Sequence, residues 1–265
     1  MFDSIRLYET FINRVNPLSK ILMATLLFVT VLLIHNPNTL LYFLLFNLIL
    51  LIILSGIKPQ YILALLGAIF ISGILSSTYM ILYGQGDTTL YRLGIIHISQ
   101  ESLIRGIHVA MRGVILSLFG ALIIFTTRIT DIFYALMIHL KLPPKYAYSF
   151  MAAIRMVPLI ISEYMQLRQA KKVRAPLINK KYVTGFAAVK STIITLLSQS
   201  IRRSYRLSIA MESKGFSNNK RSFYRETSFS RLDLYFFLLL LISLLISIYL
   251  SQHCFIFNTN DARSI

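Results

Sequence analysis

Residues 61–83 form a run of 23 positions without a charged side chain, and this run constrains the fold more than any other feature. A helix needs about 20 mostly apolar residues to cross the ~30 Å hydrocarbon core of a bilayer, since each residue adds ~1.5 Å. Shorter apolar runs occupy 21–34, 40–54, 113–125 and 234–250. Only 14% of the residues are charged, against about 25% in a typical soluble domain. The sequence therefore predicts an all-α, polytopic membrane protein with about five transmembrane helices.

The run at 113–125 is short for a span, and extending it back to residue 104 brings in Arg105, His108 and Arg112. A charged side chain at the centre of a bilayer costs at least ~2.5 kcal/mol on insertion scales. We therefore expect both arginines to lie near the membrane interface or to face a protein interior. The number of spans stays open, because 132–140 and 146–161 are also apolar.

Small residues recur every four positions along the 61–83 run and would share one helix face (Ala64, Ala68, Ser72 and Ser76). Small faces allow helices to approach closely in lipid. This face suits a neighbouring helix of the same chain or a partner subunit, and we expect the neighbouring helix.

The net charge of +17 is concentrated in one segment. Between residues 128 and 231 lie 19 of the 27 lysines and arginines, with only four acidic residues. Such an excess is typical either of nucleic-acid binding or of the cytoplasmic side of a membrane protein. Because apolar spans flank the segment, we expect a lipid-bilayer protein that binds no nucleic acid. Its N-terminus should be cytoplasmic, and 1–125 and 232–265 should form the membrane regions around a cytoplasmic region at 126–231.

Three helices are predicted in the basic segment, at 131–141, 145–172 and 184–213. Pro158 should kink or break the second helix, and Gly215 suits a left-handed cap after the third. Along the third helix, apolar residues form a stripe flanked by arginines, which predicts a long amphipathic cytoplasmic helix (stripe Ile193, Leu197, Ile201 and Tyr205; flanks Arg202, Arg203 and Arg206).

Enzymatic chemistry has little support in the sequence. No GxxxxGK[ST] or GxSxG motif occurs, the five histidines show no metal-ligand spacing, and a single cysteine, Cys254, excludes a cysteine-based metal site. No two acidic residues form a convincing pair for acid–base catalysis. We therefore expect a protein that is not an enzyme, with no catalytic residues, no bound metal and no cofactor.

Three segments resemble a known family. They are Asn16–Lys20 (NPLSK), Ala152–Pro158 (AAIRMVP) and Ile201–Phe216, which ends in AMESKGF. On these segments the chain resembles the transmembrane coupling subunit, or T component, of energy-coupling factor transporters, the family that includes the cobalt-transport membrane subunit. The resemblance covers nearly the whole chain in order.

The resemblance implies a non-catalytic subunit of a bacterial importer in the cytoplasmic (inner) membrane. Such a subunit joins two cytoplasmic P-loop ATPase subunits to a small substrate-binding membrane subunit, for uptake of a vitamin or a transition-metal ion. In the family, two Ala-Arg-Gly-like motifs end the coupling helices and dock on the ATPases. By position these motifs fall on Val173-Arg174-Ala175 and Ser213-Lys214-Gly215, where Ala175 replaces glycine and Lys214 replaces arginine. Further residues of the coupling helices are Arg155, Pro158, Arg202, Arg203, Arg206, Met211 and Glu212.

Two other functions remain as alternatives. One is the permease subunit of a conventional ABC transporter that contacts substrate itself, which would need polar pathway residues within the spans. The other is a membrane-embedded enzyme acting on lipid, against which stands the absence of clustered catalytic residues.

Overall fold

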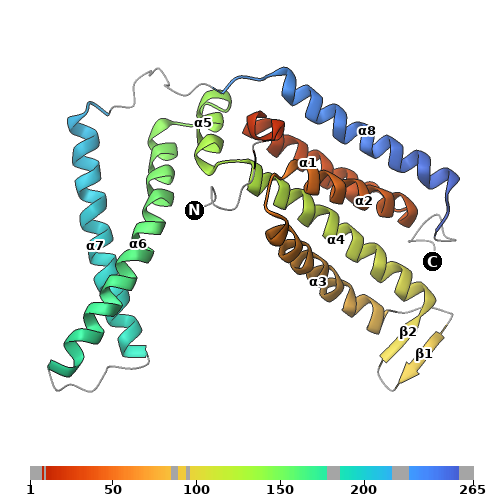
Figure 1. The fold of residues 1–265 in the computed structure, drawn as a ribbon, viewed down its shortest axis with the longest axis horizontal. Coiled ribbons are helices and arrows are strands. Elements are labelled where there is room, and N and C mark those ends of the chain that lie inside the picture. Colours follow the sequence, from red (N-terminus) through yellow and green to blue (C-terminus); the bar gives the residue numbers. More distant parts are fainter. Residues whose placement is uncertain are drawn as a thin grey trace. The chain divides into compact units, whose positions relative to one another are not determined.

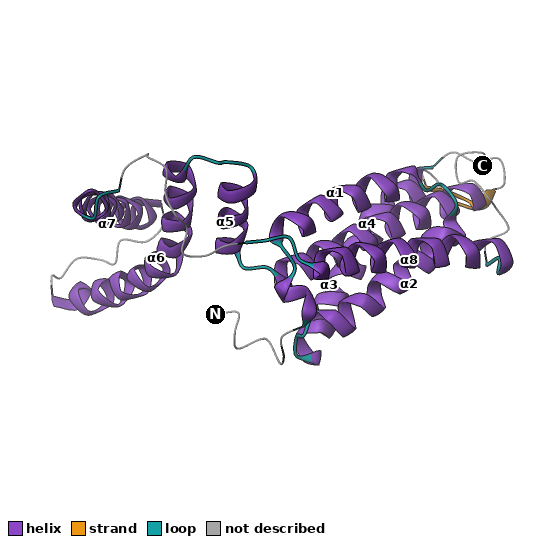
Figure 2. Ribbon diagram, turned by 90° about the horizontal axis from the view of Figure 1, so that it is seen from above, coloured by secondary structure: helices purple, strands orange, loops and turns teal. Residues whose placement is uncertain are grey.

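The computed structural model describes residues 8, 10–84, 89–93, 96–177, 186–216 and 227–256. The elements follow in the order η1 (Phe11–Arg14), α1 (Pro17–Leu33), α2 (Pro37–Leu54), α3 (Pro59–Tyr83), β1 (Thr89–Leu93), β2 (Ile96–Ser99), α4 (Gln100–Thr126), α5 (Ile129–His139), α6 (Pro144–Leu177), α7 (Phe186–Ser213) and α8 (Arg231–His253) (Figure 1). The prediction of an all-α membrane protein is confirmed. The structure adds a short antiparallel hairpin, β1–β2, which follows α3 and precedes α4 in the chain (Figure 1; strands orange in Figure 2).

Five of the described helices are long and apolar enough to cross a membrane: α2, α3, α4, α6 and α8. The number of candidate spans agrees with the prediction, but one of the five helices is not the predicted one. The run at 21–34 belongs to α1, which has 17 residues and is shorter than a full span. Residues 144–174 qualify instead, because the apolar stretch at 146–161 continues into a long helix.

The chain divides into two compact units, residues 1–135 with 227–265 and residues 136–226. In the first unit, asparagine and proline start two successive helices. Asn16 and Asn36 accept a hydrogen bond through their side chains from the backbone N–H two residues on, and a proline follows each of them. Proline is suited to the first helical position because its missing N–H would have no partner there. Three residues connect α1 to α2.

Helices α1 and α4 are antiparallel, and each supplies a cation to the C-terminal end of the other. Lys20, which is 1% exposed, donates from Nζ to the Thr126 carbonyl oxygen (3.0 Å) and to the hydroxyls of Thr126 (3.4 Å) and Thr127 (3.0 Å). Arg112 donates from Nη2 to the carbonyl oxygen of Ile34, the residue that caps α1, over 3.1 Å. Cations at helix C-termini are stabilising because the last carbonyls carry partial negative charge. The expectation that Arg112 faces a protein interior is confirmed, and we call this arrangement the reciprocal clamp.

Helices α3 and α4 pack closely through a glycine. A Cβ atom at Gly73 would lie 2.6 Å from Cγ2 of Val114, so the site has no room for a side chain. The buried residues of α3 lie on this side of the helix (Ile62, Ile69, Gly73 and Ser77).

The small-residue face of α3 lies elsewhere. Ala64, Ala68, Ser72 and Ser76 are all exposed. The expectation that this face contacts a neighbouring helix of the same chain is therefore wrong. The physical reason is that almost every residue of α3 is apolar or small, so the sequence carries little amphipathic signal to distinguish one face from another.

Helix α8 joins the first unit at its N-terminal end. Ser230 and Asp233 form a capping box at the start of α8. Asp233 also accepts a hydrogen bond at Oδ1 from the backbone N–H of Asn16 (2.8 Å). At the other end of α8, the Ser251 hydroxyl accepts a bond from Thr39 near the start of α2 (2.9 Å). Helix α8 is thus antiparallel to α2 and starts at the same end of the bundle as α1.

Candidate functional site

The second unit contains two long helices, α6 with 34 residues and α7 with 28, which contact each other at three levels. Tyr148 meets Phe216 edge-on, with ring centroids 5.8 Å apart. In the middle, Arg203 forms an ion pair with Glu163. Toward the end of α6, Lys171 donates to the hydroxyl of a residue early in α7, Thr192, over 2.9 Å. Higher numbers on α6 pair with lower numbers on α7, so the two helices form an antiparallel pair.

The second predicted motif, Ser213-Lys214-Gly215, lies at the C-terminal end of α7. Gly215 has a φ of +75°, its N–H donates to the Glu212 carbonyl (2.9 Å), and the N–H of Phe216 donates to the Met211 carbonyl (2.9 Å). These two bonds define a Schellman motif, in which a left-handed residue closes the helix and satisfies its last carbonyls. The predicted left-handed cap at Gly215 is confirmed. The cap holds the exposed Lys214 at the last turn of the helix.

The first predicted motif, Val173-Arg174-Ala175, lies in the last turns of α6. Val173 is 68% exposed and Arg174 is exposed as well. The helix continues through Ala175 and ends at Leu177. Alanine disfavours the left-handed conformation that a glycine allows, so the helix does not stop at this motif as α7 stops at its own. The two motifs therefore end their helices in different ways.

Pro158 does not break its helix. Helix α6 is continuous from Pro144 to Leu177, and its ribbon changes direction partway along (Figure 1). A proline inside a helix removes one hydrogen bond and crowds the carbonyl four residues earlier, which is the usual cause of such a bend. Of the two predicted outcomes, the helix is therefore kinked and not broken. Both Pro158 and Arg155, which lies one turn earlier, are exposed.

The arginines predicted along α7 fall into two groups. Arg203 is paired with Glu163, whereas Arg202 and Arg206 are exposed. Their helix begins at Phe186 in the structure, and the predicted start at residue 184 lies outside the described residues. Near the end of the helix, Met211 is half-buried and Glu212 is exposed.

The predicted apolar stripe of α7 is not covered by α6. Its residues are 57–69% exposed (Ile193, Leu197, Ile201 and Tyr205). An apolar helix face with basic flanks is typical of a helix that lies on a membrane surface or against a partner. The second unit (residues 136–226, called unit 2 below) therefore presents an apolar face along α7 and an exposed cation at each end of the α6–α7 pair.

Sequence reasoning missed the side chains that tie α6 to α7. The sequence did not indicate Glu163 and Lys171, which contact α7, or Tyr148, which contacts Phe216 just beyond the end of α7. One signal was available: Glu163 is the only acidic residue between Asp131 and Glu212, among many cations. An isolated carboxylate in such a segment is a natural partner for one of the arginines.

Unit 2 is characterised by exposed cations and an exposed apolar face. In the described ranges, no three His, Cys, Asp or Glu side chains come together in a way that could hold a metal ion. The two helices of unit 2 offer exposed cations, an apolar face and a fixed register between them. These features suit binding to other macromolecules or to a membrane.

Comparison with known proteins agrees with this description. The family model CbiQ, described as a cobalt transport protein, matches residues 8–224. Among curated proteins, the chain is 27% identical over 238 residues to the energy-coupling factor transporter transmembrane protein EcfT of Streptococcus equi subsp. equi, covering 85% of this chain and 87% of that protein. It is 26% identical over 261 residues to EcfT of Macrococcus caseolyticus, covering 92% and 95% of the two chains.

The fold and the match together define a multi-pass helical membrane protein of a transport system. The chain belongs to the CbiQ cobalt transport protein family.

Proposed function

We propose that the chain is the non-catalytic transmembrane coupling subunit of an energy-coupling factor importer. In this proposal, two associated cytoplasmic ATPases bind the α6–α7 pair, and the chain transmits their movements to a small substrate-binding membrane subunit. The cargo would be a vitamin or a transition-metal ion. The family match and the names of the relatives support the transport system, and the geometry of unit 2 supports the mechanism.

One observation carries the proposal: the two motifs lie at opposite ends of the α6–α7 pair. Lys214 is two residues from Phe216, which contacts Tyr148 near the start of α6, whereas Arg174 lies near its end. At ~1.5 Å per residue, 26 residues of helix separate Tyr148 from Arg174 by roughly 35–40 Å. Two cations that far apart suit one contact on each of two separate subunits better than two contacts on one small surface.

Transmission of force requires that the two helices move together. The ion pair between Arg203 and Glu163 and the bond from Lys171 to Thr192 connect α6 to α7 away from the motifs. A displaced motif at one end then shifts the pair as a rigid body, which is the common form of a switching movement. The exposed stripe of α7 supplies an apolar surface on which a membrane subunit can rest.

In this proposal the ATPase-docking residues are the exposed cations Arg174 and Lys214. A cation at the end of a helix gains electrostatic complementarity and register from an acidic groove. In this proposal α6 lies outside the membrane although it is long and apolar enough to cross it. The region 126–231 is then cytoplasmic, the N-terminus is on the same side, and 1–125 and 232–265 lie in the bacterial cytoplasmic membrane. A permease subunit that binds cargo itself is less well supported, because the named relatives are energy-coupling factor subunits.

The test is a charge reversal at both motifs. The double variant Arg174→Glu with Lys214→Glu, expressed in the native host in place of the unchanged chain, should insert into the membrane but no longer co-purify with the ATPases. The matched control reverses two exposed cations of the same helices outside the motifs, Arg168→Glu with Lys190→Glu. The control should retain both ATPases, as judged by mass spectrometry of the affinity-purified complex.

Two outcomes would contradict the proposal. If the motif variant still assembled and transported as the unchanged chain does, the docking residues would be wrong. If the unchanged chain purified from its native membrane without any ATPase, the coupling function itself would be wrong.

A further inference from the structure

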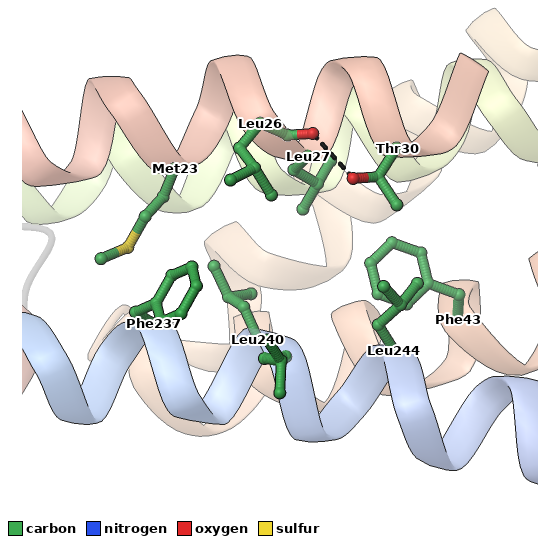
Figure 3. A pocket seen from close by; sticks show the side chains of 9 residues that line it. Met23, Leu26, Leu27, Thr30, Phe43, Phe237, Leu240 and Leu244 are labelled. Carbon is green, nitrogen blue, oxygen red and sulfur yellow. Dashed lines mark hydrogen bonds between the residues drawn. The ribbon is translucent and has the colours of Figure 1, made fainter. Parts of the chain in front are cut away.

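The first unit contains an apolar groove between α1, α2 and α8, with a cavity volume of about 180 Å³ (Figure 3). Its lining comes from three separate segments of the chain: Met23, Leu26, Leu27 and Thr30 of α1, Phe43 of α2, and Phe237, Leu240, Leu241 and Leu244 of α8. Three lining residues are buried and form the floor (Met23, Leu27 and Phe43), whereas Leu26 and Leu241 are exposed at the rim.

The groove has no unsatisfied polar group in its wall. Thr30 is its one residue with a polar side chain, and the Thr30 hydroxyl donates to the Leu26 carbonyl over 2.8 Å (Figure 3). A vitamin or a metal ion in this groove would find no partner for its polar atoms, which makes burial costly. The occupant is therefore apolar where it contacts the groove.

The shape of the groove favours one apolar occupant. The lining residues run along α1 from Met23 to Thr30 and along α8 from Phe237 to Leu244, so the groove is an elongated channel between two parallel helices. An extended hydrocarbon chain is thin enough to follow this channel, whereas a helix with its side chains is about 10–12 Å wide.

Positive charge lies at one end of the helices that form the groove. Arg231 is the first residue of α8, and Arg14 ends η1, which packs against α8; both side chains are exposed. The nearby carboxylate of Asp233 is buried and accepts hydrogen bonds from the backbone N–H groups of Asn16 and Ser230. About six residues of helix, or ~9 Å, separate Arg231 from the groove residue Phe237.

We propose that this groove binds one anionic phospholipid, with an acyl chain between α1 and α8 and the headgroup phosphate at Arg14 and Arg231. The spacing between cation and groove matches that between the headgroup and the upper acyl chain of a phospholipid. Arginine forms strong, often bidentate, hydrogen bonds with phosphate. The bound lipid fills the seam between the first and last helices of the unit.

The absence of tryptophan from the chain allows a direct test. A single tryptophan at the groove rim, Leu241→Trp, reports contact with a lipid whose acyl chains are brominated, because bromine quenches tryptophan fluorescence. The control is Ile242→Trp, since Ile242 is exposed on the same helix at nearly the same depth but does not line the groove. Each variant of the full chain is reconstituted into phosphatidylcholine vesicles with rising fractions of brominated phosphatidylglycerol or brominated phosphatidylcholine.

For Leu241→Trp, half-maximal quenching should need on the order of tenfold less brominated phosphatidylglycerol than brominated phosphatidylcholine. The reason is that a basic residue near the membrane surface attracts anionic lipid appreciably. Adding Arg14→Gln and Arg231→Gln should abolish this preference, and Ile242→Trp should show little preference. Equal curves for both lipids at the groove, or a preference that survives loss of both arginines, would overturn the proposal. Failure of either lipid to quench the groove tryptophan would also overturn it, because protein would then cover the groove.

Discussion

The substitution Lys20→Met probes the reciprocal clamp most directly. Methionine has nearly the length of lysine but no ammonium group, so it removes the three hydrogen bonds that join α1 to the end of α4. The Thr126 hydroxyl keeps its own bond to the Leu122 carbonyl (2.7 Å). The Thr126 carbonyl and the Thr127 hydroxyl lose the lysine as a partner in a buried site.

The expected loss of stability follows from these two acceptors. Leaving a buried acceptor unsatisfied costs ~1–3 kcal/mol. The Thr127 hydroxyl bears this cost, whereas the Thr126 carbonyl still accepts a hydrogen bond from the Asn13 side-chain amide over 3.2 Å. Part of the cost is offset, because a buried ammonium carries a desolvation penalty that methionine lacks. We therefore expect Lys20→Met to lower the free energy of unfolding by about 2 kcal/mol, and Thr127→Val, which removes one acceptor, by about 1 kcal/mol.

Unfolding by sodium dodecyl sulfate in mixed micelles, followed by far-ultraviolet circular dichroism, measures these differences. The control is Leu22→Met, since Leu22 lies on the same helix and is 62% exposed. It should change stability by less than ~0.5 kcal/mol. The double variant of Lys20 and Thr127 should lose less than the sum of the two single losses. A loss below ~0.5 kcal/mol for Lys20→Met, or additive losses in the double variant, would refute the reasoning.

Three further predictions concern helix packing and the motif ends. Gly73→Ala should destabilise the first unit by about 1–3 kcal/mol in the same assay, because its Cβ would lie 2.6 Å from Val114, whereas Gly67→Ala, with open space around it, should not. Gly215→Ala should cost about 1–2 kcal/mol through its φ of +75° alone, since nothing lies within 4 Å of an added Cβ, and should weaken ATPase co-purification. Lys214→Arg should slow ATPase dissociation severalfold in surface-binding measurements, because guanidinium can bind a carboxylate in a bidentate manner; unchanged kinetics would argue against direct contact at this position.

Local chemistry explains what the sequence predicted correctly. Gly215 was recognisable as a cap because a glycine after an amphipathic run is the usual left-handed residue of a helix end. The apolar runs predicted helices because few other structures satisfy the backbone in a membrane. For the candidate site, the exposure of Arg174 and Lys214 agrees with their predicted position at helix ends.

What the sequence did not predict depends on partners far along the chain. Lys20 is at the start of an apolar run, a place where lysine commonly extends toward lipid headgroups, yet it is buried against Thr126, 106 residues away. The pairing of Glu163 with Arg203 likewise depends on the register between α6 and α7, which neither helix encodes alone. The sequence also did not indicate which face of α3 packs against α4, because the faces of α3 differ little in polarity.

The position of Arg112 has a consequence for the order in which the helices enter the membrane. Helix α4 is 27 residues long, and Arg112 lies near its middle, where it reaches the end of the much shorter α1. An arginine beside an apolar run opposes insertion of that helix alone, by up to ~2.5–3.5 kcal/mol when it lies at the bilayer centre. Helix α1 is synthesised first, and its terminal carbonyl at Ile34 supplies a hydrogen-bond acceptor for this arginine. A first helix already in place should therefore favour integration of α4 during synthesis, and deleting α1 should lower the fraction of α4 that inserts.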